Sequence, residues 1–316
     1  MEGHIRLSVA EYSVRLQLTQ SGRLSAHMGT TLRGGLGRAL RWTSCVQEQA
    51  ACSDCLLQCR CAYGYLFETP VPPDSPAMRR YTHAPHPFVL RAPAVHPSCF
   101  EQGDTIDLSL LMVGRAADYF PFLLFALMHL GELGLGSDRL TFEIDEVRAT
   151  ADGVLVYENG RRGPVIPAPL TQAEAAVGPA QVMRFRLHYV TPLRLRVRET
   201  VLRHPEFSSL VSAALRRLQL LCLLHDAGDF QVDAAALVRL ACSVRLVRDR
   251  TWWREISRHS TRQDGTMPMG GLMGDAEFEG DLGTFRAILA LAGRVHVGKG
   301  TAFGHGCFQV EEDGHA

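Results

Sequence analysis

Two kinds of hydrophobic pattern follow one another at the start of this chain. Apolar residues occupy every second position in residues 5–9 and 14–18, which is the period of half-buried strands. From about residue 30 they recur at helical spacing through residues 31–40, although three glycines there each cost about 1 kcal/mol relative to alanine. Glycines on one side of a helix indicate the close approach of another backbone. We therefore predict two strands followed by a closely packed helix.

The rest of the chain alternates between the same two signals. We predict a strand at 63–67, a loop or extended segments over 70–98, a strand at 105–113, a helix at 116–133, a hairpin of 140–147 and 154–157, alternating strands within 182–197, helices at 207–224 and from about 234, strand-like segments around 252 and 278, a short helix from 285 and a strand at 307–310.

A change of composition divides the chain. Residues 160–179 are rich in proline, alanine and glycine, so we place a boundary there, between domains at 1–165 and 180–316. Each half mixes strands with two helices. This pattern predicts an α+β protein of tandem ferredoxin-like (RRM-like) domains.

Composition narrows the class of protein. A hydrophobic content of 46% with 21% charged residues excludes a disordered chain, a collagen-like repeat and a pure coiled coil. The longest apolar run, residues 120–130, is shorter than the roughly 20 residues that a membrane helix needs. The first residues are polar and lack the apolar core of a secretory signal. We expect a cytoplasmic protein without a membrane partner.

Charge is distributed unevenly, although the formal net charge is zero. Residues 181–262 hold 15 arginines and 7 acidic residues, a local charge of +8, so the remainder carries −8. Such a split indicates a face that binds a polyanion, and a set of solvated helix faces is the alternative interpretation. Lys299 is the single lysine of the chain, against 32 arginines.

Five of the nine cysteines lie close together in the first half of the chain. The pattern Cys45-x6-Cys52-x2-Cys55-x5-Cys61 supplies the soft ligands of a tetrahedral zinc site, and Cys59 is a fifth candidate that could replace Cys61, so one of the five is surplus. Four thiolates would close the coordination shell, so the predicted zinc is structural, in an insertion at residues 45–61 of the first domain. Reduced, unliganded thiols and an iron–sulfur cluster are the alternatives.

Glycines follow a G-x-G-x3-G-x-G pattern near the C-terminus. Glycine allows a backbone to approach a phosphate, and successive N–H groups can form an anion-binding concavity. The P-loop spacing before Lys-Ser/Thr is absent, and the glycines do not lead from a strand into a capped helix as a dinucleotide-binding motif does. A plain hairpin is the alternative interpretation. The candidate RNA-binding residues of this loop are Gly298, Gly300, Gly304, His305 and Gly306, beside Lys299 and His296. The valines that flank His296 suit a strand that either buries or exposes it.

Arginines alternate with aromatic and hydroxyl side chains in residues 252–263. This mixture suits contacts to RNA phosphates and stacked bases. A partly buried strand with solvated arginines is the alternative interpretation. The candidate RNA-binding residues here are Arg254, Arg258, His259, Arg262 and Gln263.

These features together resemble the CRISPR-associated precursor-crRNA-processing endoribonucleases of the RAMP superfamily. The resemblance is carried by the start of the helix at residues 32–34, the cysteine cluster leading into residues 63–68, Arg262-Gln263, residues 270–271 and the terminal segment from His296 through the glycine-rich loop. It covers most of the chain, and residues 70–180 contribute least. Within this family, the chain is similar to the branch with an N-terminal cysteine cluster.

The resemblance implies a CRISPR repeat RNA, in the form of precursor crRNA, as the substrate. It also implies cleavage without a catalytic metal, in which the 2′-hydroxyl attacks the neighbouring phosphate and leaves a 2′,3′-cyclic phosphate and a 5′-hydroxyl. That reaction needs a base, a cation for the phosphorane charge and an acid for the leaving oxygen. By position, His27 matches the general base, Lys299 the cation and His296 a second acid or base. His305 stands where the family more often has an apolar residue.

Two other classes of protein stay open at this stage. One is a non-cleaving RNA-binding RAMP subunit of a CRISPR effector complex, and other effector subunits are partners that either hypothesis admits. The other is a zinc or iron–sulfur protein unrelated to RNA, which would need an open coordination position. The endoribonuclease and the non-cleaving subunit differ in whether a reactive histidine lies beside the scissile phosphate.

Overall fold

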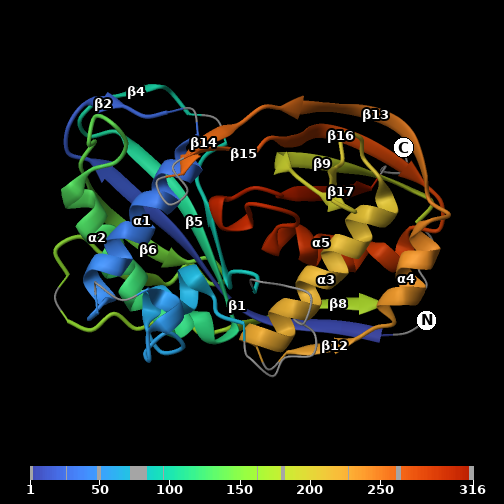
Figure 1. Cartoon of the computed structure of the whole chain (residues 1–316), viewed down its shortest axis with the longest axis horizontal. Coiled ribbons are helices and arrows are strands. Elements are labelled where there is room, and N and C mark those ends of the chain that lie inside the picture. The colour runs from blue at the N-terminus through green and yellow to red at the C-terminus, as the bar shows by residue number, and fades with distance from the viewer. Residues whose placement is uncertain are drawn as a thin grey trace. The chain divides into compact units, whose positions relative to one another are not determined.

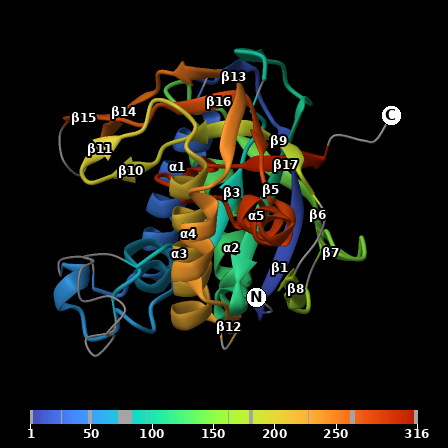
Figure 2. The same ribbon diagram turned by 90° about the vertical axis from the view of Figure 1, so that its right-hand side faces the viewer.

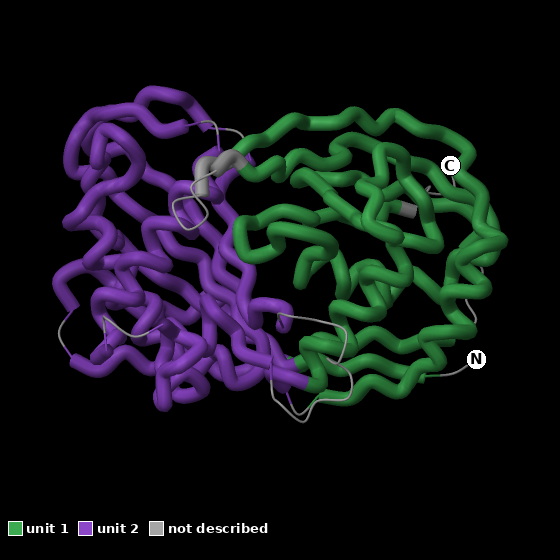
Figure 3. The backbone as a smooth tube through the Cα atoms, in the orientation of Figure 1, with its two compact units in different colours: residues 1–7, 172–223, 227–316 green, residues 8–171, 224–226 purple. Residues whose placement is uncertain are grey.

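The computed structural model describes residues 3–25, 27–47, 51–71, 84–94, 96–161, 163–178, 182–226, 228–260 and 265–312. It divides into two compact units (Figure 3). The N-terminal unit comprises residues 8–171 and 224–226, and the C-terminal unit comprises residues 1–7, 172–223 and 227–316. Both combine helices with antiparallel strands, which confirms the predicted α+β class.

The N-terminal unit has the βαββαβ element order of a ferredoxin-like domain. The elements of this motif are β1 (Gly3–Leu18), α1 (Met28–Ser44), β3 (Phe88–Arg91), β5 (Thr105–Val113), α2 (Phe120–Leu133) and β6 (Phe142–Ala149) (Figure 1). The strands lie in the order β3-β5-β1-β6, with β7 (Leu155–Glu158) at the edge, and neighbouring strands run antiparallel. Shorter elements are β2 (Gly22–Arg23), η1 (Cys52–Asp54), η2 (Gly64–Glu68), β4 (Cys99–Phe100) and η4 (Gly114–Tyr119).

The C-terminal unit repeats this order. Its motif consists of β9 (Arg184–Leu193), α3 (Phe207–His225), β13 (Arg245–Arg254), β16 (Gly271–Glu279), α5 (Gly283–Val295) and β17 (Phe308–Glu312). The sheet order β13-β16-β9-β17 places the first strand of the motif between the third and fourth, as in the N-terminal unit. The helices α3 and α5 lie on one side of this sheet (Figure 1, Figure 2). The two strand orders therefore match the predicted tandem ferredoxin-like arrangement.

Smaller elements complete the C-terminal unit. They are β8 (Thr171–Val177) and β12 (Asp229–Gln231), which both pair with β1, the ribbons β10 (Arg196–Val197) with β11 (Thr200–Val201) and β14 (Ser257–Ser260) with β15 (Gly265–Pro268), α4 (Ala234–Ala241) and η5 (Thr301–Phe303).

The cores form from the predicted alternation. In β9, Phe185, Leu187 and Tyr189 are at most 1% exposed, whereas the intervening residues face away from the helices. Phe207 at the start of α3 lies 5.1–5.9 Å, between ring centroids, from Phe185, Phe278 and Phe285, which joins two strands to α5.

The glycines of α1 make room for side chains and not, as expected, for another backbone. A Cβ at Gly35 would lie 2.8 Å from a methyl group of Leu130 in α2, and one at Gly37 would lie 2.8 Å from the ring of Phe67. Arg33 stacks on the same ring, with its guanidinium carbon 4.6 Å from the centroid. The glycines therefore set how closely α1 packs on α2 and on η2.

The predicted strand at residues 63–67 is wrong. These residues belong largely to η2, a π-helical turn closed by the Thr69 N–H donating to the Gly64 carbonyl at 2.8 Å. A short apolar run fits a buried helix as well as a buried strand, so periodicity alone could not separate them. Four of the five residues of η2 are buried, which accounts for the apolar run.

One described helix, α3, is long and apolar enough to span a membrane by length and composition. Its apolar side chains have a different explanation in this fold, because Leu210, Val211, Leu218 and Leu221 are at most 1% exposed within the protein core. Arg217 on the same helix is buried and donates from Nε to the Val295 carbonyl of α5 at 2.9 Å.

Candidate nucleic-acid interface and active-site residues

The glycine-rich loop connects α5 to β17 in the C-terminal unit. Its glycines at 298, 300, 304 and 306 all have positive φ, between 80° and 91°. A Cβ would lie 1.9 Å from the Val297 carbonyl oxygen at Gly306 and 2.6 Å from the Arg194 carbonyl oxygen at Gly298. The architecture of the loop therefore requires these two glycines before any ligand is considered.

Hydrogen bonds within the unit engage much of the loop backbone. The Lys299 N–H donates to the Arg194 carbonyl at 3.0 Å, and the Gly306 N–H donates to the Pro192 carbonyl at 3.0 Å. The N–H groups of residues 303, 304 and 305 donate to carbonyls of the loop itself. The anion-binding concavity of successive N–H groups is thus not formed at residues 303–306. What the loop presents to an anion is the exposed side chain of Lys299.

His296 does not occupy the position expected of an acid or base. Its exposed fraction is 0%, and it ends α5 with a φ of 60°. Its Nδ1 lies 3.0 Å from the His305 carbonyl oxygen, to which an Nδ1–H donates. A fully buried ring cannot touch a phosphodiester, so the predicted catalytic role is corrected to a structural one between α5 and the loop.

His305 is also turned inward. It is 7% exposed, and its Nδ1 would lie 3.2 Å from a Cβ at Gly300. The side chain therefore packs beneath the opposite end of its own loop and helps to hold it, and its contact with RNA stays a prediction.

Ion pairs with acidic residues neutralise several arginines of the basic segment. Glu279 accepts from Arg184 at 3.1 Å and from Arg245 at 3.0 Å, and these bonds and charges hold the pKa of Glu279 below its usual range. Further pairs across the sheet are Arg186 with Glu311 and Arg248 with Glu277, both at 3.5 Å. These acidic partners lie after residue 262, outside the window that counted +8. For these arginines, the interpretation as a solvated face is the one that the structure supports.

A second group of arginines surrounds Trp253 at the end of β13. The guanidinium carbon of Arg203 lies 3.7 Å from the centre of the indole, and that of Arg194 lies 5.9 Å from it. Arg194 donates to the Gly270 carbonyl at 3.0 Å, and its pKa is lowered by burial and then by the charge of Arg203. We call Arg194, Arg203, Trp253 and Arg254 the Trp253 cluster.

The Trp253 cluster is connected directly to the glycine-rich loop, because the Arg194 carbonyl accepts the Lys299 N–H. Sequence analysis named Arg254 but missed Arg194 and Arg203. Arg194 stands at a polar position of the alternation Leu193-Arg194-Leu195, so the pattern did not distinguish it from the other arginines there. Arg203 joins the cluster through its contact with Trp253, which lies 50 residues further along the chain. Local residue spacing does not reveal such a contact.

The remaining basic candidates fall on the ribbon of β14 and β15. Arg258 pairs with Met267 and His259 with Thr266 in the antiparallel register, and their side chains lie outside what the structure describes. Arg262 and Gln263 lie outside the described residues altogether.

His27, the candidate base, is the N-cap residue of α1 in the N-terminal unit. Its carbonyl accepts the Thr30 N–H at 3.0 Å and the Thr30 hydroxyl at 2.8 Å, and its ring makes no capping bond to the helix. The half-buried residue thus lies at the N-terminus of α1. His27 and Lys299 belong to different units, and each is described within its own.

The cysteine segment forms no metal site in the structure. Among the residues described, no group of three or more His, Cys, Asp or Glu side chains is arranged to hold a metal ion. Cys45, Cys52, Cys55 and Cys61 are half-buried free thiols, and Cys59 is exposed.

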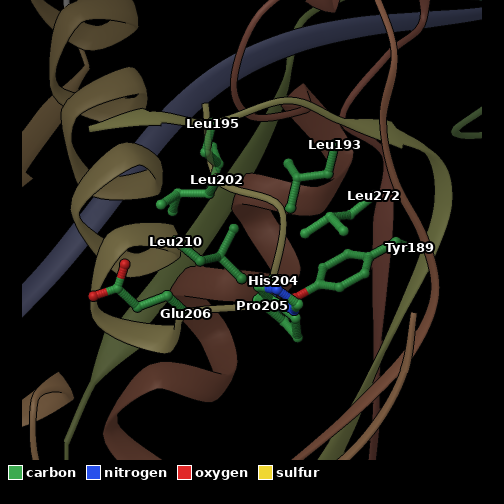
Figure 4. Close-up of a pocket in the computed structure, with 9 residues that line it drawn as sticks. All are labelled: Tyr189, Leu193, Leu195, Leu202, His204, Pro205, Glu206, Leu210 and Leu272. Carbon is green, nitrogen blue, oxygen red and sulfur yellow. The ribbon is translucent and has the colours of Figure 1, made fainter. Parts of the chain in front are cut away.

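The small cavity of the C-terminal unit does not resemble a ligand site. Tyr189, Leu193, Leu210 and Leu272 line it together with the turn at residues 204–206 (Figure 4). Its volume of about 10 Å³ is close to the minimum for a single water molecule. This cavity is therefore too small to hold a substrate, whereas a wider and more open pocket of the same unit, of about 370 Å³, is lined by Glu174, Arg286 and Arg294 beside apolar residues.

Two ferredoxin-like units, the second with a cationic glycine-rich loop, define a RAMP-type protein. The family model described as "CRISPR-associated endoribonuclease Cas6" matches residues 187–308, and that of the AF_1859 N-terminal domain matches residues 7–170. The chain belongs to the Cas6 family of CRISPR endoribonucleases. An uncharacterized protein of Archaeoglobus fulgidus is 22% identical over 308 residues, which cover 96% of this chain and 98% of the relative.

Solved structures share the fold. A Cas6 from Thermus thermophilus, in a product complex, matches with 15% identity and a TM-score of 0.55 over 96% of this chain and 99% of that one. A chain of a Cas6-RT-Cas1–Cas2 complex matches with 12% identity and a TM-score of 0.59. That match covers 98% of this chain but only 29% of the other, and a partial form of the complex is covered to 47%.

Proposed function

We propose that this protein cuts precursor crRNA within its CRISPR repeat, by attack of the 2′-hydroxyl on the adjacent phosphate and without a catalytic metal. The observation that carries the proposal is the Cas6 endoribonuclease match over residues 187–308, the part of the chain that presents Lys299 on its glycine-rich loop. One RNA fragment ends in a 2′,3′-cyclic phosphate, and the other begins with a 5′-hydroxyl.

Two side chains take two of the three roles that this chemistry demands. His27 accepts the proton of the 2′-hydroxyl, a role that a neutral imidazole can take, and the leaving 5′-oxygen takes its proton from water. Lys299 supplies positive charge to the phosphorane, and its exposed ammonium is held at the loop by the bond from its own N–H to Arg194. His296 has no part in this scheme because it is buried.

The RNA strand is bound by the Trp253 cluster. Arginine and tryptophan together suit a single strand, because guanidinium groups pair with phosphates while aromatic faces stack on bases. Arg203 is itself paired with Glu255 at 3.4 Å, so this proposal rests on Arg194 and Arg254. The ion-paired arginines of the outer sheet face contribute less, since their charge is already compensated. Association with other CRISPR proteins is a further proposal, supported by similar chains that occur in Cas6-RT-Cas1–Cas2 complexes.

The first experiment incubates the protein with labelled repeat RNA from its own locus in EDTA, beside the same RNA with a 2′-deoxy sugar at the cut. We expect one cut that EDTA leaves intact and the deoxy sugar abolishes. Loss of cleavage on chelation, with binding preserved, would contradict the mechanism. Tight binding of the ordinary RNA without any cut would favour a non-cleaving RNA-binding subunit.

Substitution of His27 tests the assignment of the base. His27→Ala should lower the cleavage rate at saturating RNA by about 100-fold or more, as expected for loss of a general base. His204→Ala is the control, because His204 is 88% exposed and belongs to the turn before α3. Equal rates for the two variants would remove His27 from the mechanism.

Salt dependence tests the Trp253 cluster. Arg254→Ala should reduce the slope of log affinity against log salt by about 0.7, the value of one phosphate contact to a single strand. Arg184→Ala, which removes an ion-paired arginine of the outer face, should change the slope less. The opposite order would place the RNA on the sheet face.

A further inference from the structure

One face of α2 in the N-terminal unit is apolar and open to solvent. An α-helix turns by about 100° per residue, so the side chains of α2 divide into two opposite faces. Leu123, Leu127 and Leu130 face the core and are at most 6% exposed. The opposite face carries large apolar side chains that are 39–59% exposed, namely Phe122, Phe125, Met128 and Leu133. A helix that is apolar on all sides is ordinarily buried on all sides, so this face lacks its expected cover.

Trp42 extends the exposed face onto α1, which lies beside α2 (Figure 1). Trp42 is 65% exposed and stacks on the His129 ring, with 4.1 Å between the ring centroids and 13° between the planes. His129 is one helical turn from both Phe125 and Leu133, so it joins Trp42 to the face of α2. We call this surface the α2 patch, and its members are Trp42, Phe122, Phe125, Met128 and Leu133.

The α2 patch is large for the surface of a monomer. At about 200 Å² for a whole aromatic side chain, the exposed fractions amount to roughly 500 Å² of apolar area. The largest apolar patch on a typical monomer covers about 300–600 Å², and such patches often have a function. A standard interface buries about 800 Å² on each partner, with a polar rim around an apolar centre. The patch therefore supplies the apolar centre of an interface as large as a stable dimer needs.

Charged groups at the edge of the patch suit a second copy of the same surface. Glu132 is 78% exposed on α2, and its carboxylate lies 3.2 Å from Nδ1 of His129. Arg38 is exposed on α1, one helical turn before Trp42. Each copy thus presents an acidic and a basic group beside the patch. Two copies related by a two-fold axis can therefore bring opposite charges together at the rim of their contact.

The composition of α2 fits a protein partner and not a lipid surface. Helices that lie on a membrane carry lysine and arginine beside their apolar face, whereas α2 contains neither. Its 14 residues are also fewer than the roughly 20 that span a bilayer. Aromatic side chains and methionine are enriched at the centres of protein interfaces, and interfaces between identical subunits are the more apolar ones.

We propose that two copies of this chain associate through the α2 patch, with α2 of each copy packed against α2 of the other across a two-fold axis. Phe125 is at the middle of the exposed face, so the axis passes close to it. Trp42 lies about 20 Å along α1 from its first residue, at about 1.5 Å per residue, so the contact and His27 are at opposite ends of that helix. The proposal stands whether or not the protein cleaves RNA.

Sedimentation velocity of the full-length protein without RNA, over a series of micromolar concentrations, is the test. We expect the wild type to sediment as a dimer, and Phe125→Glu to raise the dissociation constant of the dimer at least about 30-fold. Leu240→Glu is the matched control, because Leu240 is 44% exposed on α4, outside the patch, and this variant should stay dimeric. Both substitutions are at exposed positions, so circular dichroism should show an unchanged fold.

A wild type that stays monomeric throughout the concentration series would overturn the proposal. Equal association of the wild type and Phe125→Glu, or equal loss in Phe125→Glu and Leu240→Glu, would overturn the assignment of the surface. Binding of the wild type, but not of Phe125→Glu, to vesicles of phosphatidylcholine and phosphatidylglycerol would overturn the second copy as the occupant of the patch.

A mixture of two variants tests the two-fold arrangement itself. Phe125→Glu and Phe125→Arg should each be monomeric, because like charges would meet across the axis. An equimolar mixture of the two should form a dimer, because opposite charges then meet there. Variants that stay monomeric in the mixture, while the wild type is dimeric, would overturn the packing of α2 on α2.

Discussion

The glycine-rich loop and the cysteine segment are both irregular, but they differ in how much of each is buried and hydrogen-bonded. The loop is built into its unit: Thr301 and Ala302 are at most 7% exposed, and its amides bond to carbonyls of β9 and of the loop. The cysteine segment has no buried side chain among its described residues. One is kept in shape by packing and glycine geometry, whereas the other gains little from packing. The two should therefore fail under different perturbations.

The largest effect should come from filling the space at Gly306. A methyl group there would lie 1.9 Å from the Val297 carbonyl oxygen, and the backbone has a φ of 80°, which alanine rarely adopts. We expect Gly306→Ala to lower the free energy of unfolding by about 3 kcal/mol, measured by urea denaturation. Gly160→Ala is the control for backbone strain alone, since Gly160 has a φ of 77° and open space around it. It should cost about 1 kcal/mol. Equal losses would show that the loop is not tightly packed.

The next effect concerns the charge that the loop carries. Lys299→Ala should leave stability within about 0.5 kcal/mol, because the side chain is exposed and the anchoring bond uses the backbone N–H. The cleavage rate should fall about 100-fold, as for removal of one group that stabilises developing charge. Single-turnover cleavage with saturating RNA is the measurement. A loss of stability with unchanged cleavage would assign Lys299 to the architecture of the loop instead.

The reverse result is expected for His296. His296→Ala removes a fully buried ring and its bond to the His305 carbonyl, so it should cost about 2 kcal/mol of stability. The cleavage rate, measured well below the unfolding temperature, should stay within about three-fold of the wild type, a change of less than 1 kcal/mol. A folded variant with no cleavage would restore His296 as a catalytic residue and show that the buried ring becomes accessible with RNA.

Local periodicity sufficed for much of the fold. The strand at 105–113 has the predicted bounds, and the alternation of Phe185, Leu187 and Tyr189 correctly gave the inner face of β9. It failed at residues 63–67, where an apolar run forms a π-helical turn against α1. The strand orders were beyond prediction, because pairing joins residues far apart in the chain, such as Leu16 with Ile106 and Ile144.

The candidate site was predicted less well, for the same physical reason. A count of charges over 181–262 could not register that Glu279 and Glu311 lie across the sheet from its arginines. The burial of His296 depends on how α5 packs, and its flanking valines fitted either outcome. The Trp253 cluster required the contact with Arg203, which no local pattern contains.

The smallest effect is the one that best separates the two regions. Leu56 is 97% exposed, so Leu56→Ala should change the free energy of unfolding by less than about 0.5 kcal/mol. Leu66, ten positions later in η2, is fully buried, and Leu66→Ala should cost about 3 kcal/mol. Urea denaturation of both variants makes the comparison. A cost of 2 kcal/mol at Leu56 would show that the cysteine segment packs on a partner surface, because only burial makes a leucine truncation expensive.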